Sequence, residues 1–224
     1  MILVFDLDGT LFDMLSYCKS GDLAVANFMQ KEWGISAKES YGRMLRIIES
    51  KGTSNLFDTI LKQYHVYSKK AVAECLSAYR LHTPKIALYD DAARCLKRFK
   101  DYAKYIVTDG NKIVQHTKVL ALGLDRVVKK AFITHRHGRH NAKPSPYCLT
   151  KIAQIEKVDP KEVVYIGDNP NKDFVGIKPL GFKTVRIMRG AHKDVRLTKH
   201  HDAHIKISSL DELTEKVINR FNCN

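Results

Sequence analysis

The chain opens on a run of apolar residues that ends in two carboxylates. Residues 1–5 are all apolar, and Asp6 and Asp8 follow on either side of a leucine. A continuous apolar run of this length predicts a strand that is buried on both faces, as in a parallel sheet covered by helices. In open α/β folds, ligands bind beyond the carboxyl ends of such strands. The first ten residues therefore favour an α/β fold with a polar site at one edge of its sheet.

Most of the remaining chain repeats this arrangement. Further strand-like runs occur at 103–107, 127–133, 163–166, 184–187 and 204–207. We expect helices over 91–100, 112–122, 146–156 and 173–179, and a last helix that begins at a capping box on Ser209. Alternating strands and helices with right-handed crossovers predict a Rossmann-like, doubly wound parallel sheet.

Residues 14–87 interrupt the alternation of strands and helices. Amphipathic segments follow one another there with no strand between them, at 15–33, 37–50, 54–64 and 68–81. The turn residues Gly34, Gly52 and Pro84 end three of these segments. The pattern predicts an all-α domain over 14–87, inserted into an α/β core made of 1–13 and 88–224.

The chain is strongly basic, with 38 Lys+Arg against 24 Asp+Glu and a formal net charge of +14 over 224 residues. Such a charge is typical of proteins that bind nucleic acids or acidic membranes. Here the excess is spread over both parts of the chain without a polybasic tract, which favours a solvated surface. We expect no nucleic-acid partner, although net charge alone does not exclude one. No apolar run reaches the roughly 20 residues of a membrane helix, so we expect no membrane partner.

The five cysteines are odd in number and form no C-x-x-C pair. This usage favours a reduced intracellular protein over a disulfide framework or a zinc ribbon. We expect the thiols to be buried parts of the core. No signal-peptide pattern precedes the first strand, which predicts a cytoplasmic protein. The sequence leaves the oligomeric state open.

Polar residues of matching chemistry follow four of the predicted strands. They are Asp6, Asp8, Gly9 and Thr10 after the first, Thr108, Asp109 and Gly110 after the second, Lys143 in the loop beyond the third, and Asp168 and Asp173 after the fourth. The carboxyl ends of parallel strands meet at one edge of a sheet, so these loops should converge. Carboxylates, a hydroxyl and a lysine together suit a phosphate group and a hard cation.

In this order, the residues resemble the motifs of the haloacid dehalogenase (HAD) superfamily, in its phosphatase branch and near phosphoglycolate phosphatase-like proteins. The D-x-D-G-T motif is matched by Asp6, Asp8, Gly9 and Thr10, the hydroxyl motif by Thr108, the lysine motif by Lys143, and the G-D-x-x-x-x-D motif by Asp168 and Asp173. The likeness covers nearly the whole chain and implies a HAD-like fold whose inserted helices are a C1-type cap. Asp109 departs from the pattern, because the family often has Asn there.

The resemblance implies a catalytic role for each motif. Asp6 would attack phosphorus and form an aspartyl-phosphate. Asp8 would protonate the leaving oxygen and later activate water. Thr108 would hydrogen-bond a phosphoryl oxygen, and Lys143 would neutralise both Asp6 and the phosphoryl group. Residues assigned to substrate binding are Gly9, Thr10, Asp109 and Gly110.

The same resemblance implies Mg²⁺ as cofactor. Asp6, the backbone carbonyl of Asp8, and Asp168 would supply the oxygen ligands that Mg²⁺ prefers. Asp173 would orient a metal-bound water or Lys143 without binding the metal directly. As an alternative, Asp173 is the N-cap of the helix expected over 173–179.

The predicted activity is hydrolysis of a small phosphomonoester, such as a sugar phosphate, phosphoglycolate or a nucleotide. A phosphomutase of the same fold is one alternative. A nucleic-acid-associated protein, such as a polynucleotide-end phosphatase, is another. In the inserted helices, Arg43, Arg46 and Lys51 either attract an anionic substrate or belong to a solvated helix face. The loop 135–140, with three histidines and two arginines, contacts substrate, binds a transition metal or is solvated.

Overall fold

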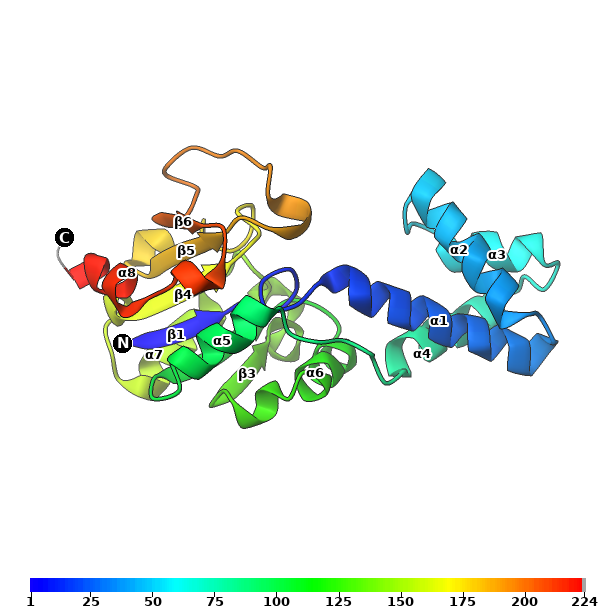
Figure 1. Ribbon diagram of the computed structural model, residues 1–224, viewed down its shortest axis with the longest axis horizontal. Coiled ribbons are helices and arrows are strands. Elements are labelled where there is room, and N and C mark those ends of the chain that lie inside the picture. The colour runs from blue at the N-terminus through cyan, green and yellow to red at the C-terminus, as the bar shows by residue number, and fades with distance from the viewer. Residues whose placement is uncertain (223–224) are drawn as a thin grey trace. The chain divides into compact units, whose positions relative to one another are not determined.

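The structure, a computed structural model, describes residues 1–222, apart from the side chains of residues 51 and 222 (Figure 1). It divides into two compact units. The core unit consists of Met1–Met14 and Ile86–Asn224, and the helical unit consists of Leu15–Lys85. Cys223 lies outside the described residues.

As far as residue 222, the core unit is built on six parallel strands in the order β3-β2-β1-β4-β5-β6. Their bounds are β1 (Ile2–Phe5), β2 (Ala103–Thr108), β3 (Lys130–Ile133), β4 (Val163–Gly167), β5 (Lys183–Ile187) and β6 (Ile205–Ile207). All four residues of β1 are buried, because the strand lies in the middle of the sheet between β2 and β4. The predicted α/β fold with a doubly wound parallel sheet is confirmed.

Helices cover both faces of this sheet. They are α5 (Asp90–Arg98), α6 (Lys112–Ala121), α7 (Tyr147–Glu156) and the short α8 (Glu215–Asn219). Figure 1 shows α5 crossing in front of β1. The chain steps outward through the sheet from β1 to β3 and then back to β4, so right-handed crossovers place α7 on the face opposite α5 and α6. Leu149 and Ile152 of α7 accordingly share a core cluster with Ile2 and Val4 of β1.

The helix predicted over 173–179 is wrong. This segment is irregular, and only a 3-10 turn follows at Lys178–Leu180. An ion pair and a close approach of the two backbones place it against the loop that carries Lys143. The carboxylate of Asp173 turns inward to the amine of Lys143 at 2.8 Å, and a Cβ on Gly176 would lie 1.8 Å from the carbonyl oxygen of Pro144. These tertiary contacts prevail over the local preference for a helix.

Two other expected boundaries shift. The capping box on Ser209 forms, but it opens a 3-10 turn at Leu210–Glu212, and α8 starts later with Thr214 as its N-cap. The strand expected from residue 127 begins at Lys130, because residues 127–129 continue the turn that follows Leu124–Arg126. Both shifts lie at element ends, where local patterns are least decisive.

The helical unit contains the four expected helices, α1 (Met14–Trp33), α2 (Ala37–Lys51), α3 (Leu56–Gln63) and α4 (Lys69–Leu81). Ser36 and Ser68 cap α2 and α4 with their hydroxyl groups. The fully buried side chains of this unit include Val25, Met29, Met44, Ile60, Leu61 and Cys75. The unit therefore has a hydrophobic core of its own.

The cysteines mostly lie where the sequence predicts. Cys75, Cys95 and Cys148 are buried with free thiols, whereas Cys18 is half-buried. Burial raises the pKa of the Cys75 and Cys95 thiols to about 12, so both are thiols at neutral pH. Within residues 1–222, none of the helices combines the length and the hydropathy that crossing a membrane requires.

The helical unit contains a buried acid, and this predicts a pH-dependent stability. Asp22 on α1 is 3% exposed, and burial raises its pKa to about 6. Because the folded pKa lies above the unfolded value of about 4, ionisation weakens the fold, and stability is lost as the pH rises from about 4 through 6. We expect Asp22→Asn to stabilise this unit more at pH 7 than at pH 4, by up to about 3 kcal/mol.

Denaturant unfolding of the full chain tests this expectation. Trp33 is the only tryptophan of the protein and lies in the helical unit, so its fluorescence reports that unit. Glu49→Gln removes an exposed acid from the same unit and is the control. A gain in unfolding free energy for Asp22→Asn that is equal at both pH values would contradict the expectation.

Candidate active site

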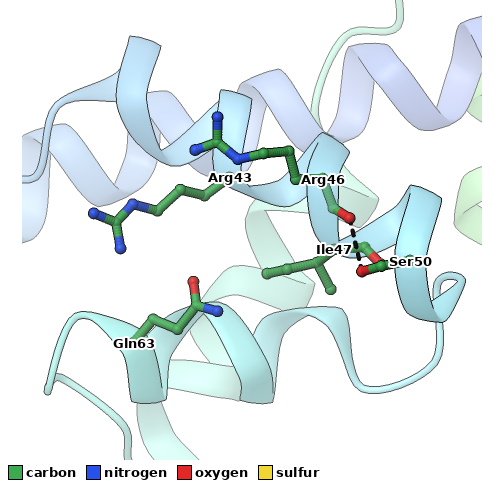
Figure 2. Close-up of a pocket in the computed structure, with 5 residues that line it drawn as sticks. All are labelled: Arg43, Arg46, Ile47, Ser50 and Gln63. Atoms are coloured by element: carbon green, nitrogen blue, oxygen red, sulfur yellow. Dashed lines mark hydrogen bonds between the residues drawn. The ribbon is translucent and has the colours of Figure 1, made fainter.

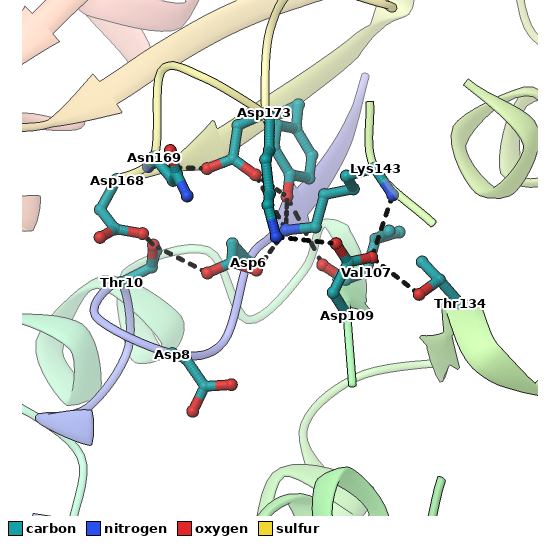
Figure 3. Close-up of polar contacts among 12 residues, drawn as sticks. Asp6, Asp8, Thr10, Val107, Asp109, Thr134, Lys143, Asp168, Asn169 and Asp173 are labelled. Carbon is teal, nitrogen blue, oxygen red and sulfur yellow. Dashed lines mark hydrogen bonds and ion pairs between the residues drawn. The ribbon is translucent and has the colours of Figure 1, made fainter. Parts of the chain in front are cut away.

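A buried lysine between two carboxylates forms the centre of the site (Figure 3). The Nζ atom of Lys143 lies 2.5 Å from Asp6 Oδ1 and 2.8 Å from Asp173 Oδ1, and none of the three side chains is more than 8% exposed. The Tyr165 hydroxyl accepts a hydrogen bond from Lys143 at 2.9 Å and donates one to Asp173 at 3.1 Å. Asp173 also accepts from the backbone N–H of Asn169 at 2.9 Å. Lys143 is therefore fixed from several directions.

The electrostatics of this cluster follow from burial and from an excess of acids. Burial, with the nearby charges of Asp173 and Asp168, raises the pKa of Asp6 well above its usual value despite Lys143. Burial alone would lower the pKa of Lys143, but Asp173 and Asp6 raise it well above its usual value. Burial and the charge of Asp173 also raise the pKa of Asp168 to about 7. Three acids share one ammonium group, so the cluster favours an additional cation.

Asp6 and Asp168 face each other across Thr10. The Thr10 hydroxyl lies 3.4 Å from Asp6 Oδ2 and 3.4 Å from Asp168 Oδ1, and its single proton can serve only one of them at a time. Gly9 has a φ of +76°, and a Cβ there would lie 2.7 Å from Asp168 Oδ2, so only glycine fits beside this carboxylate.

The donor set suits Mg²⁺. In the described chain, no three His, Cys or acidic side chains converge into a metal-binding group. Mg²⁺ commonly uses only one or two carboxylates and keeps several waters, so the two facing carboxylates agree with its needs. The side chain of Asp8 points away from Asp6 and Asp168, so its carboxylate is not part of this facing pair (Figure 3).

Thr108 ends β2, beside the end of β1. It is 1% exposed, and among the described residues its hydroxyl oxygen has no hydrogen-bond partner. A buried hydroxyl without a partner costs free energy unless a ligand supplies one. Gly110 follows in a conformation with φ +131°, where a Cβ would lie 2.9 Å from the amide nitrogen of Gln115. The end of β2 is thus built to receive a hydrogen-bonding group.

Asp109 directs its carboxylate to a neighbouring loop. Its Oδ1 atom accepts hydrogen bonds from the hydroxyl of Thr134 at 2.7 Å and from the backbone N–H of Lys143 at 3.0 Å. Lys172 lies 3.9 Å from its other oxygen. The carboxylate therefore fastens the loop that carries Lys143 to the end of β2.

Four side chains of this site were not predicted from the sequence. Tyr165 belongs to an apolar strand and resembled an ordinary core residue. Thr134 lies at the start of the histidine-rich loop. Gln115 and Lys118 contact Asp8 from α6, at 2.7 Å each, and both are buried. Their only local signal is that two polar residues spaced i, i+3 fall on the buried side of an amphipathic helix.

The two arginines expected in the inserted helices line a pocket within the helical unit (Figure 2). The pocket has a volume of about 340 Å³ and lies between α2 and α3; its lining residues are Arg43, Arg46, Ile47, Ser50 and Gln63. Arg43 pairs with Glu39 at 2.8 Å and lies 4.9 Å from the centre of the Tyr64 ring. The side chain of Lys51 lies outside what the structure describes.

The loop 135–140 consists of two 3-10 turns, Thr134–His137 and Arg139–Asn141. The ring of His137 stacks on Phe132 with centroids 5.8 Å apart. Asn141 donates a hydrogen bond to the carbonyl of His137 at 2.7 Å and contacts the ring of His140 at 3.2 Å. The two arginines of the loop are exposed. Internal contacts thus order the loop, and its contact with substrate stays a prediction.

Comparisons with known proteins identify the family of the chain. Residues 1–181 match the family model of haloacid dehalogenase-like hydrolases. A glyceraldehyde 3-phosphate phosphatase of Pyrococcus furiosus is 31% identical over 96% of this chain and 91% of its own length. A protein of the same name from Methanocaldococcus jannaschii is 28% identical over 97% of this chain and 96% of its own.

The chain is also similar to a solved structure. The HAD phosphatase of Thermococcus onnurineus is 25% identical, with a TM-score of 0.61, and the match covers 96% of this chain and 97% of that one. The family match spans well over half of the chain and includes all the motifs that lie along the sheet edge. The chain therefore belongs to the haloacid dehalogenase-like hydrolase family and is one of its phosphatases.

Proposed function

We propose that this phosphatase hydrolyses small phosphomonoesters, foremost short-chain sugar phosphates, with Mg²⁺ as its cofactor. The observation that carries the proposal is the buried carboxylate of Asp6, which lies 2.5 Å from the ammonium group of Lys143 at the end of β1. The hydroxyl of Thr108, which has no hydrogen-bond partner within residues 1–222, lies at the end of the adjacent strand β2. A nucleophile, a cation and a hydrogen-bond donor at one sheet edge suit phosphoryl transfer, which depends mainly on positioning and charge neutralisation.

The proposed reaction has two steps. A carboxylate oxygen of Asp6 attacks phosphorus, and the bond from phosphorus to the leaving oxygen breaks while Asp8 gives that oxygen a proton. Asp8 then takes a proton from water, which attacks phosphorus, releases inorganic phosphate and restores Asp6. Thr108 and the backbone near Gly9 and Gly110 would hold the phosphoryl oxygens. Lys143 would offset their negative charge throughout.

Asp6, Asp168 and the backbone carbonyl of Asp8 would hold Mg²⁺, which would supply further charge neutralisation when bound. Asp173 would orient Lys143, whose Nζ atom lies 2.8 Å from Asp173 Oδ1, and would not bind the metal. The raised pKa values of Asp6 and Asp168 support this assignment, because burial makes both carboxylates unfavourable as anions without a cation nearby.

The helical unit would act as the C1-type cap, with its predicted limits at residues 14–87. Its pocket offers the guanidinium groups of Arg43 and Arg46, which suit an anionic ligand. A cytoplasmic location is supported by the free thiols of the four described cysteines.

The first test concerns the nucleophile and the metal. We expect Asp6→Asn to lower kcat for p-nitrophenyl phosphate at least about 1,000-fold, because the amide cannot form the acyl phosphate. Asp90→Asn makes the same substitution at an exposed aspartate outside the site, and it should leave kcat unchanged. EDTA should abolish the activity of the unmodified enzyme, and added Mg²⁺ should restore it. Activity that survives Asp6→Asn would refute the mechanism.

The second test concerns the substrate. In a phosphate-release screen, we expect kcat/KM to be highest for glyceraldehyde 3-phosphate and similar three-carbon phosphates, because the relatives over the full chain bear that name. Phosphoglycolate, hexose phosphates and nucleotides should rank lower. Conversion of a sugar phosphate into its isomer without phosphate release would favour a phosphomutase. A 5′-phosphorylated oligonucleotide as best substrate, with steep salt dependence, would favour a nucleic-acid role.

The third test concerns Asp109. An Asn side chain keeps the oxygen that accepts from Thr134 and from the backbone of Lys143, so Asp109→Asn should retain kcat within about threefold. Asp109→Ala leaves both donors without a partner, which costs about 1–3 kcal/mol and loosens the loop of Lys143. We therefore expect kcat for p-nitrophenyl phosphate to fall at least about tenfold. Equal activity in the two variants would show that the carboxylate does not hold this loop.

A further inference from the structure

The side chain of Asp8 is held by two residues of a single helix. Lys118 Nζ lies 2.7 Å from Asp8 Oδ1, and Gln115 Nε2 lies 2.7 Å from Asp8 Oδ2. Gln115 and Lys118 are one turn apart on α6, which begins directly after the loop at the end of β2. Both carboxylate oxygens of Asp8 are thus occupied by donors that the same rigid element presents.

The lysine in this arrangement is unusual because it is buried. The side chain of Lys118 is 3% exposed, whereas that of Asp8 is 19% exposed. Burying an ammonium group is expensive unless a charge and hydrogen bonds compensate for it. The Nζ atom of Lys118 also lies 5.8 Å from the centre of the Phe12 ring. Phe12 comes shortly after the D-x-D-G-T motif. A lysine that serves only solubility would extend into water.

Gln115 connects this contact to the phosphate-binding loop. Its amide also donates a hydrogen bond to the backbone carbonyl of Asp109. The same side chain packs so closely against Gly110 that a Cβ there would lie 2.9 Å from it. The position of Asp8 is therefore coupled to the loop that is proposed to hold the phosphoryl oxygens.

We propose that Lys118 is a positioning residue for proton transfer, with Gln115 as its assistant. The pair fixes the carboxyl group of Asp8 in the orientation from which it protonates the leaving oxygen. General acid catalysis requires the acid within hydrogen-bond reach of that oxygen, and a freely rotating side chain meets this condition only part of the time. The inference rests on the proposed role of Asp8 as the general acid and adds the residues that make it effective.

The dependence of kcat/KM on the leaving group distinguishes a role in proton transfer from a merely structural role, which would affect all leaving groups equally. A nitrophenolate leaves readily without a proton, whereas an alkoxide depends on the acid. The ratio kcat/KM covers the steps up to departure of the leaving group, so it isolates proton donation from later hydrolysis of the aspartyl-phosphate.

Lys118→Met should therefore act selectively on the poor leaving groups. Across a series of substituted phenyl phosphates and glycerol phosphate, we expect kcat/KM to change less than about threefold for the best leaving group. For glycerol phosphate we expect a loss of at least about 30-fold, within the range of general acid catalysis. KM should change little. Lys118→Arg, which keeps the cation, should recover part of the loss.

A double-mutant cycle locates the effect. In an Asp8→Asn background the proton donor is already absent, so Lys118→Met should cause no further selective loss. Lys97→Met removes an exposed lysine from α5 and is the matched control. Thermal unfolding shows whether each variant folds. If Lys118→Met does not fold, Gln115→Met removes the other contact without removing a charge and should give the same selectivity.

The outcomes separate this inference from the proposed function. Loss of activity in Asp6→Asn, together with equal losses for every leaving group in Lys118→Met or Gln115→Met, would overturn the positioning role and leave the phosphatase mechanism intact. Unchanged kcat/KM for glycerol phosphate in the folded variants would also overturn it. Retained activity in Asp6→Asn would instead count against the proposed mechanism itself.

Discussion

The site depends on one buried ammonium group. Lys143 lies between Asp6 and Asp173, and the Tyr165 hydroxyl completes its contacts. Without this lysine, the buried carboxylates around it would face only like charges, and the loops that carry them could not close together. The irregular course of residues 173–179 and the anchoring of the Lys143 loop by Asp109 both serve to hold this arrangement. Even with Lys143 the acids remain in excess, which explains why the site suits a divalent cation.

The protein combines a basic surface with an acidic interior site. A net charge of +14 is typical of proteins that bind nucleic acids, but here the excess is spread over both parts of the chain. The charges that matter for chemistry, however, are the few acids gathered at the carboxyl edge of the sheet. Asp6, Asp168 and Asp173 are each at most 6% exposed, so they contribute little to the outer surface. The net charge mainly reflects the many exposed basic side chains. A few buried acids change it too little to reveal an acidic site.

Much of the fold followed from local patterns. The apolar run that became β1 and the alternation of strands with helices were sufficient to predict the parallel sheet, since burial on both faces demands such runs. The order of the motifs along the strands predicted which residues would meet at one edge. The helix expected over 173–179 failed for the opposite reason. Its acid is held by Lys143, some 30 residues away, and no local pattern contains that contact.

The sequence alone determined the parallel sheet, the inserted helices and which motif residues lie at the carboxyl edge, because hydrophobic periodicity and the order of the motifs along the chain indicate them. Only the tertiary structure decided how these residues are held. The contacts of Lys118 and Gln115 with Asp8 span 110 and 107 positions of the chain. Such contacts depend on how α6 packs against the sheet and which of its side chains turn inward toward the loop that follows β1. Docking is a property of the packed core as a whole, so spacing along the chain does not reveal it.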